Sequence, residues 1–149
     1  MNNSPIGVYD SGFGGLSVWR EIHRRLPEES LLYLGDGKNC PYGGRSREEI
    51  TAFAREAVER LIGEGVKMVV VGCNTATTAA VDALRAEWPD VPIVGLEPAV
   101  KPACLSSRTR RIAVLATKHS LQSDMFLRTA SRYAEDVEVI KVVGRDFVE

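Results

Sequence analysis

Short apolar runs alternate with longer amphipathic stretches along this chain. The runs have the length of buried strands and lie at residues 6–9, 31–34, 68–71, 92–95, 111–116 and 137–142. Between them, helical periodicity predicts helices over 15–26, 47–62, 76–88 and 123–133. Strands that are joined by helices pair in parallel through right-handed crossovers. The pattern therefore predicts an α/β fold, a parallel sheet flanked by helices.

Local signals mark several helix ends. Ser46 and Glu49 form a predicted capping box immediately before Ile50, the first apolar position of the second helix. Pro27 and Pro89 follow the first and third helices, where a proline stops further helical turns. These signals support the helix assignments independently of the periodicity.

Composition narrows the classes of function. The chain has 149 residues, a net charge of -1 and a pI near 6.2, which gives no electrostatic reason to expect nucleic acid or an anionic membrane surface as a partner. No apolar run approaches the roughly 20 residues of a membrane span, and the first residues lack the features of a signal peptide. The three cysteines, Cys40, Cys73 and Cys104, form no CxxC pair, so we expect no metal site and no disulfide framework. That cysteine usage is typical of a reducing, cytoplasmic compartment.

Three loops follow predicted strands and are richer in glycine and polar residues than a simple connector requires. They span residues 10–15 (DSGFGG), 35–44 (GDGKNCPYGG) and 72–75 (GCNT). In parallel α/β folds ligands bind at the carboxyl ends of the strands, so we expect the loops to meet at one crevice. The first loop is similar to a dinucleotide-binding fingerprint, but its last glycine is missing and Asp10 would face the pyrophosphate.

Cys73 has two interpretations. A cysteine at the end of a buried strand is commonly a small core residue. A thiol at a helix N-terminus instead gains thiolate character, and Asn74 and Thr75 beside it offer donors suited to a carboxylate. His23 and His119, the two histidines, show no spacing that predicts a Cys–His dyad. Proton transfer by a cysteine, paired with an aspartate at a neighbouring strand end, is the better use of the thiol.

The motifs together resemble the N-terminal part of the bacterial glutamate racemases, within the cofactor-independent aspartate/glutamate racemase family. The matching stretches are IGVYDSGFGGLSVWREI, YLGDGKNCPYGGRS, VKMVVVGCNTATTAAVDALR and VPIVGLEPAVKPA. They cover nearly all of residues 6–105, with a weaker match to residue 143. The CNTA motif alone would indicate the wider family, which includes aspartate racemases, whereas the PYG loop points to glutamate.

The resemblance implies interconversion of L- and D-glutamate by two-base proton transfer without a cofactor or metal, which would supply D-glutamate for peptidoglycan. Cys73 would take a proton from the α-carbon or return it, and Asp10 would hydrogen-bond that thiol and manage its proton. The carboxylate of Asp10 would oppose thiolate formation, whereas the helix terminus would favour it. The implied substrate-binding residues are Asp10, Ser11, Tyr42, Gly43, Asn74, Thr75 and Thr117. Ala116 replaces the glycine that usually precedes the last of these in the family.

One departure concerns the second base, which in the family is a cysteine followed by threonine and histidine. The chain contains no such triplet. We therefore expect a fragment in which residues 1–97 form a first domain, incomplete without a returning C-terminal segment, and residues 98–149 begin a second α/β domain. Such a chain alone would be inactive, with apolar surface exposed or covered by a partner chain. A homodimer, a racemase of aspartate or another acidic amino acid, and a non-catalytic amino-acid-binding half stay open as alternatives.

Overall fold

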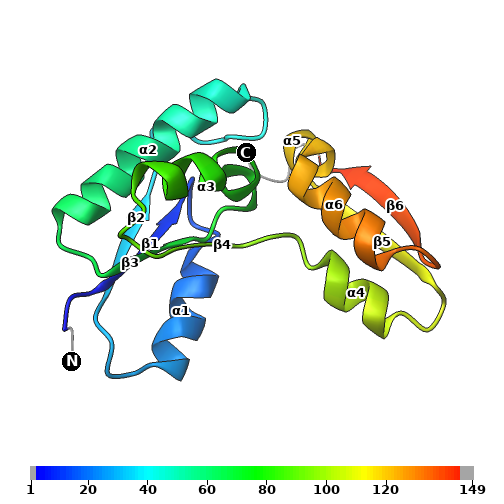
Figure 1. Ribbon diagram of the computed structural model, residues 1–149, viewed down its shortest axis with the longest axis horizontal. Helices are drawn as coiled ribbons and strands as arrows, with labels where there is room; N and C mark the ends of the chain where they lie inside the picture. The colour runs from blue at the N-terminus through cyan, green and yellow to red at the C-terminus, as the bar shows by residue number, and fades with distance from the viewer. Residues whose placement is uncertain (1–2, 145–149) are drawn as a thin grey trace.

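The computed structural model describes residues 3–144, which form two α/β units joined by an extended segment after β4 (Figure 1). The strands are β1 (Ile6–Asp10), β2 (Leu31–Gly35), β3 (Met68–Val71), β4 (Ile93–Gly95), β5 (Arg111–Ala116) and β6 (Glu138–Val143). The helices are α1 (Leu16–Arg25), α2 (Arg47–Gly63), α3 (Asn74–Glu87), α4 (Val100–Ser106), α5 (Lys118–Gln122) and α6 (Asp124–Tyr133). All six predicted strands and all four predicted helices are present, and the parallel α/β fold class is confirmed.

The first unit is a four-stranded parallel sheet with strand order β2-β1-β3-β4. Helices α2 and α3 cover one face and α1 covers the other (Figure 1). On the α2/α3 face, Tyr9 and Val71 pack against small and branched helix residues such as Ala54 and Ala80. On the opposite face, Val8 packs under the apolar side of α1. Strand β1 is an inner strand in this order and is buried along its whole length, so its C-terminal end lies between those of β2 and β3.

Side chains cap the N-termini of α2 and α3. The capping box of α2 is confirmed, since the Ser46 side chain accepts from the Glu49 backbone N–H and the Glu49 side chain accepts from the Ser46 backbone N–H. Helix α3 begins at Asn74, two residues before the predicted start at Ala76. Cys73 is its N-cap residue, a position at which a side-chain acceptor satisfies one of the free amides of the first turn.

The second unit is a two-stranded parallel sheet of β5 and β6, packed against α4, α5 and α6. Cys104, Leu121 and Phe126 belong to its buried core. The other face of this sheet is open, since Leu115 and its register partner Val142 are 54% and 41% exposed. Parallel sheets are usually covered on both faces, but within residues 3–144 this sheet is covered on one face only.

Two helices were not predicted from the sequence. Helix α5 follows Thr117, and helix α4 contains Pro102 as its third residue. The N–H groups of the first turn have no partner within a helix, so a proline there removes no helical hydrogen bond.

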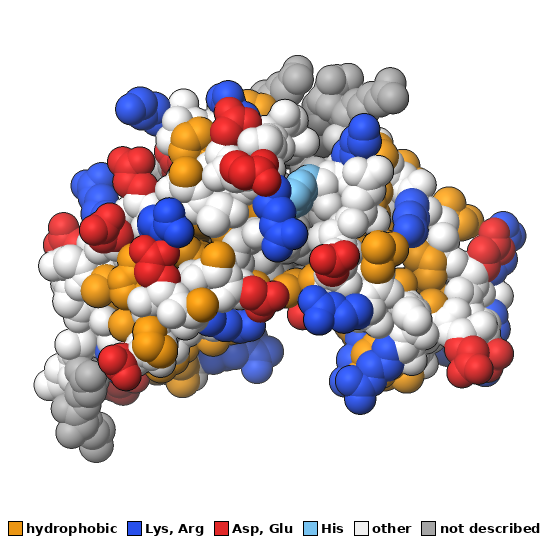
Figure 2. Space-filling view, turned by 45° about the horizontal axis from the view of Figure 1, so that its top comes forward, with side chains coloured by type: hydrophobic (Ala, Val, Ile, Leu, Met, Phe, Trp, Pro, Cys, Tyr) orange, Lys and Arg blue, Asp and Glu red, His pale blue; other side chains and the backbone are white. Residues whose placement is uncertain are grey.

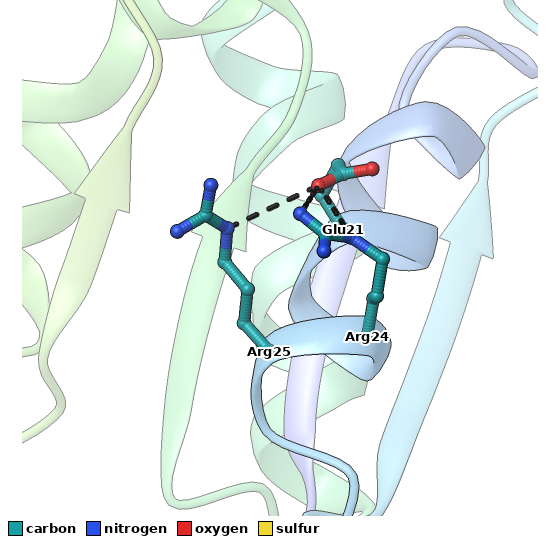
Figure 3. A network of polar contacts seen from close by, with 3 residues as sticks. All are labelled: Glu21, Arg24 and Arg25. Carbon is teal, nitrogen blue, oxygen red and sulfur yellow. Dashed lines mark hydrogen bonds and ion pairs between the residues drawn. The ribbon is translucent and has the colours of Figure 1, made fainter.

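The surface shows mixed charge. On the outside of α1, the Glu21 carboxylate contacts Arg24 at 2.9 Å and Arg25 at 3.9 Å (Figure 3). Such exposed pairs contribute little to stability. Figure 2 shows acidic and basic side chains interspersed over one face, without an extended area of either sign. Within residues 3–144, no helix is long and apolar enough to cross a bilayer.

Candidate active site

The three loops singled out in the sequence leave the same edge of the first sheet. Asp10, the last residue of β1, is the register partner of Gly35, the last residue of β2. Tyr9 is the partner of Val71, at the end of β3. Because the strands are parallel and in register, residues 10–15, 35–44 and 72–75 all begin at the carboxyl edge, where α/β proteins bind ligands.

Cys73 lies at this edge with a nearly buried thiol. Its side chain is 7% exposed, and its sulfur lies 3.3 Å from the Ser11 hydroxyl. The same sulfur accepts a hydrogen bond from the Ala76 backbone N–H at 3.4 Å. The thiol is therefore fixed between a hydroxyl from the first loop and the first turn of α3, in contact with polar groups.

Asp10 occupies the neighbouring strand end and is 6% exposed. Its Oδ1 accepts from the Gly12 backbone N–H at 2.8 Å. Gly15 leaves room for this side chain, since a Cβ on Gly15 would lie 2.6 Å from the Asp10 Cβ. Gly15 has a helical φ of -63°, so the close approach, and not the backbone conformation, requires glycine. The hydrogen bond that the resemblance implied between Asp10 and the thiol stays a prediction.

Tyr33 adds a support that sequence reasoning missed. Its hydroxyl donates to the Gly12 carbonyl at 2.7 Å and so holds the first loop from the side of β2. Burial, followed by the charges of Asp10 and Cys73, raises the pKa of Tyr33 to about 12. Tyr33 therefore remains a hydrogen-bond donor at neutral pH. Its position within an apolar strand gave no signal of this role.

Hydroxyl groups connect the two units beside the thiol. Thr75 Oγ1 lies 3.2 Å from Thr117 Oγ1, the N-cap hydroxyl of α5. Thr117 also contacts the Ser120 hydroxyl at 3.0 Å. Gly43 approaches the same place, since a Cβ on Gly43 would lie 3.1 Å from the Thr117 methyl carbon. The structure thus brings Gly43, Thr75 and Thr117 together, while Asn74 is exposed on the first turn of α3.

Tyr42 is positioned differently from the other expected binding residues. Its side chain is 2% exposed and belongs to the core of the first unit. Its hydroxyl contacts the Tyr9 hydroxyl at 2.7 Å and donates to Asp36 at 2.6 Å. The phenol is therefore engaged within the protein. Sequence reasoning missed Tyr9 and Asp36, although Asp36 directly follows β2 and this position could have drawn attention to it.

Two hollows in the surface lie away from Cys73. One, of about 270 Å³, is lined by residues of α2, α3, α5 and α6 that include Arg47 and His119. The other, of about 420 Å³, lies at the far end of the second unit and includes Cys104. Neither is lined by Cys73, Asp10 or Ser11. Within residues 3–144, no group of three metal-ligating side chains is gathered.

The fold and the site define a class of protein: a parallel α/β protein whose central strand ends present a thiol, a carboxylate and a group of hydroxyls to one edge. Residues 6–146 match the model of the Asp/Glu/Hydantoin racemase family. The chain belongs to that family.

Individual relatives agree with this assignment. The chain is 46% identical to a glutamate racemase of Herpetosiphon aurantiacus over 149 residues, which cover 100% of this chain and 58% of that protein. It is similar to Escherichia coli glutamate racemase solved with L-glutamate and an activator (TM-score 0.88, 31% identity, 96% of this chain and 54% of that one). It is also similar to the Francisella tularensis enzyme solved with D-glutamate (TM-score 0.79, 30% identity, 96% and 53%). The chain spans about half the length of these relatives.

Proposed function

We propose that this chain is the N-terminal part of a glutamate racemase, in which Cys73 is one of two bases that exchange the α-proton of glutamate. The observation that carries the proposal is the fixed thiol at the N-terminus of α3, 3.3 Å from Ser11 and at the strand end next to Asp10. Solved relatives that hold L-glutamate and D-glutamate support the choice of substrate.

Inversion of a stereocentre requires a base on each face of the substrate. The Cys73 thiolate removes the α-proton from one face, the electron pair is delocalised into the carboxylate, and a second group delivers a proton to the opposite face. The α-proton is weakly acidic, so donors must stabilise the charge that develops on the carboxylate. Ser11, Asn74 and Thr75 provide such donors around the thiol, and Gly43 and Thr117 close the same side. In one direction of the reaction the Cys73 thiolate removes the α-proton, and in the other direction the Cys73 thiol donates a proton to the α-carbon.

The second base is not supplied by the other cysteines. Cys104 is 5% exposed in the core of the second unit, and Cys40 lies in the loop after β2 on the same side as Cys73. We therefore propose that the opposing base belongs to a part of the protein outside these 149 residues. Residues 1–97 would be the first domain and residues 98–149 the start of the second. The activity is proposed to be cytoplasmic and to supply peptidoglycan synthesis, and a homodimer stays a prediction.

Glutamate binding and turnover by residues 1–149 test this proposal. Isothermal titration with D-glutamate, L-glutamate and L-aspartate should show weak binding that prefers glutamate, since half of the surroundings of the substrate is missing. Circular dichroism of D- or L-glutamate incubated with the chain should show no loss of optical activity. A Cys73→Ser chain and a complete-length protein are measured beside it as controls. Racemisation by the chain that depends on Cys73 would contradict the fragment assignment, and a preference for aspartate would favour the alternative substrate.

A further inference from the structure

A relay of hydrogen bonds beneath the 35–44 loop has no part in the proton transfer described above. The Tyr42 hydroxyl lies 2.6 Å from Asp36 Oδ2 and 2.7 Å from the Tyr9 hydroxyl. A carboxylate accepts only, so Tyr42 donates to Asp36 and its oxygen is left to accept from Tyr9. The relay therefore runs in one direction, from Tyr9 through Tyr42 to Asp36.

Asp36 is attached to the site at more than one point. Its backbone N–H donates to the Asp10 carbonyl at 2.9 Å. Its two carboxylate oxygens accept from the Asn39 side-chain amide at 3.1 and 2.9 Å. The Asp36 carboxylate thus gathers Asn39 and Tyr42 of the loop, and the Asp36 backbone N–H joins this group to the end of β1. Hydrogen bonds to an ionised acceptor are shorter and stronger than neutral ones.

Burial makes the relay costly to break. Tyr9 and Tyr42 are 0% and 2% exposed. Burial, followed by the hydrogen bonds to Asp36 and Tyr9, raises the pKa of Tyr42 far above its usual value, so the hydroxyl stays protonated. A phenylalanine would fill the same space, since Tyr42 already packs against Phe53 with ring centres 5.6 Å apart. What the hydroxyl adds is a fixed orientation of the loop.

We propose that Tyr42 and Asp36 are positioning residues: their hydrogen bond holds the 35–44 loop against the end of β1 and thereby places Gly43 against Thr117 at the crevice. The proposal rests on the proposed function in one respect, that the crevice binds glutamate. It adds to the expectation that Tyr42 belongs to the substrate-binding residues a role for the Tyr42 side chain. In this assignment Tyr42 acts through the backbone of the residue that follows it.

Cys40 provides a reporter of the loop that does not depend on catalysis. Its thiol is half-buried, and a Cβ on Gly12 would lie 3.5 Å from its sulfur. Burial, followed by the charges of Asp10, Cys73 and Asp36, raises the pKa of Cys40, so its alkylation is slow while the loop is held. Release of the loop would relieve the burial and speed the reaction.

The experiment measures the rate at which iodoacetamide labels Cys40 in natively folded residues 1–149, followed by mass spectrometry. The parent, Tyr42→Phe and Tyr9→Phe chains are compared. Tyr42→Phe removes the donor to Asp36 and keeps every charge near Cys40, so release of the loop should expose the thiol and raise its labelling rate several-fold. Tyr9→Phe removes the β1 hydroxyl that contacts Tyr42 but keeps the bond from Tyr42 to Asp36, so the labelling rate of Cys40 should rise less than in Tyr42→Phe. Equal rates in Tyr42→Phe and the parent, or equal increases in the two variants, would overturn the proposal.

Hydrogen exchange covers the case in which Tyr42→Phe does not fold. Asp36→Asn keeps the size of the side chain and weakens its acceptor, so amide exchange of the 35–44 loop should quicken while exchange of α2 stays unchanged. If the 35–44 loop and α2 of Asp36→Asn show the same change in amide exchange relative to the parent, or no change, the positioning role is contradicted.

Activity provides a separate comparison. In a complete-length protein, Tyr42→Phe should raise KM for glutamate about tenfold with a smaller change in kcat, because ground-state placement of the substrate is affected more than proton transfer. A complete-length parent without racemase activity would refute the proposed function and leave the labelling result standing. An active parent whose Tyr42→Phe variant keeps the parent KM would refute the positioning role alone.

Discussion

The Cys73 sulfur lies 3.3 Å from the Ser11 hydroxyl, so residues 62 positions apart in the chain share one hydrogen bond at the edge of the sheet. Both side chains are less than a tenth exposed. The contact joins the loop after β1 to the helix that follows β3. Together with the Ala76 backbone N–H, it holds the thiol in place at this edge.

Loss of this hydroxyl should affect both stability and turnover. Ser11→Ala leaves the sulfur with one hydrogen-bond partner fewer and should lower the free energy of unfolding by about 1 kcal/mol. In a complete-length protein kcat should fall about tenfold, since a misplaced base is costly. Urea denaturation and circular dichroism of glutamate measure the two effects. Ser17→Ala removes an exposed hydrogen bond from α1 to Gly14 of the same loop; it is the control and should change neither.

The two glycines before α1 should differ sharply in their tolerance of a methyl group. A Cβ on Gly15 would lie 2.6 Å from the Asp10 Cβ, whereas a Cβ on Gly14 would lie 4.0 Å from the nearest Asp10 oxygen. Gly15→Ala should therefore cost about 1–3 kcal/mol of stability through overpacking and should weaken glutamate binding. Gly14→Ala should stay within about 0.5 kcal/mol of the parent. Equal urea midpoints for the two variants would show that the close packing at Asp10 is not as described.

Two leucines of the second unit test whether the outer face of β5 and β6 is open. Leu121 is 4% exposed and Leu115 is 54% exposed. Leu121→Ala should cost about 2–5 kcal/mol in residues 1–149, and Leu115→Ala should cost less than about 1 kcal/mol, because little of its side chain leaves water on folding. Denaturant unfolding compares them directly. A large cost for Leu115→Ala would mean that this face is covered in solution by another chain.

How far the sequence predicts the structure can be followed at Ser46 and at Tyr42. The capping box at Ser46 depends on residues three positions apart, so local chemistry was sufficient to predict it. The direction of the Tyr42 phenol depends on Asp36 and Tyr9, and the latter is 33 residues away. Only the packed structure shows that contact. Strand ends were predictable from apolar runs, and with them the edge on which Cys73 and Asp10 lie.

The missed helices have a physical explanation as well. Helices α4 and α5 have seven and five residues, too short for helical periodicity to show. Thr117 caps α5, and its neighbours give no capping box. The contact between Thr117 and Thr75 depends on how the two units meet, which no local pattern contains.

His119 should make stability depend on pH. Burial, followed by the neighbouring Arg47 guanidinium, lowers the pKa of His119, and Glu48 acts weakly in the opposite sense. The folded state therefore favours neutral His119. Its contribution is fully present above the unfolded pKa of about 6.5 and is lost as the pH falls from there through the folded pKa.

Urea denaturation between pH 7.5 and 5 measures this contribution. His119→Gln should flatten the decline in stability across the interval, whereas Gln122→Ala, a change in the same helix that adds no titrating group, should keep it. If the free energy of unfolding depends on pH in the same way in the parent and His119→Gln chains, His119 is not the source of that dependence.

The measurement that tests the central role of Cys73 most directly is α-proton exchange in D₂O, followed by NMR for L- and D-glutamate separately in a complete-length protein that contains this chain. The parent should exchange both enantiomers and racemise them. Cys73→Ser should racemise about 10²–10⁴-fold more slowly, because a serine hydroxyl is a far poorer base. Exchange should survive for the one enantiomer whose α-proton faces the other base. A Cys73→Ser protein that racemises glutamate at the parent rate, or exchanges both enantiomers equally, would contradict the account.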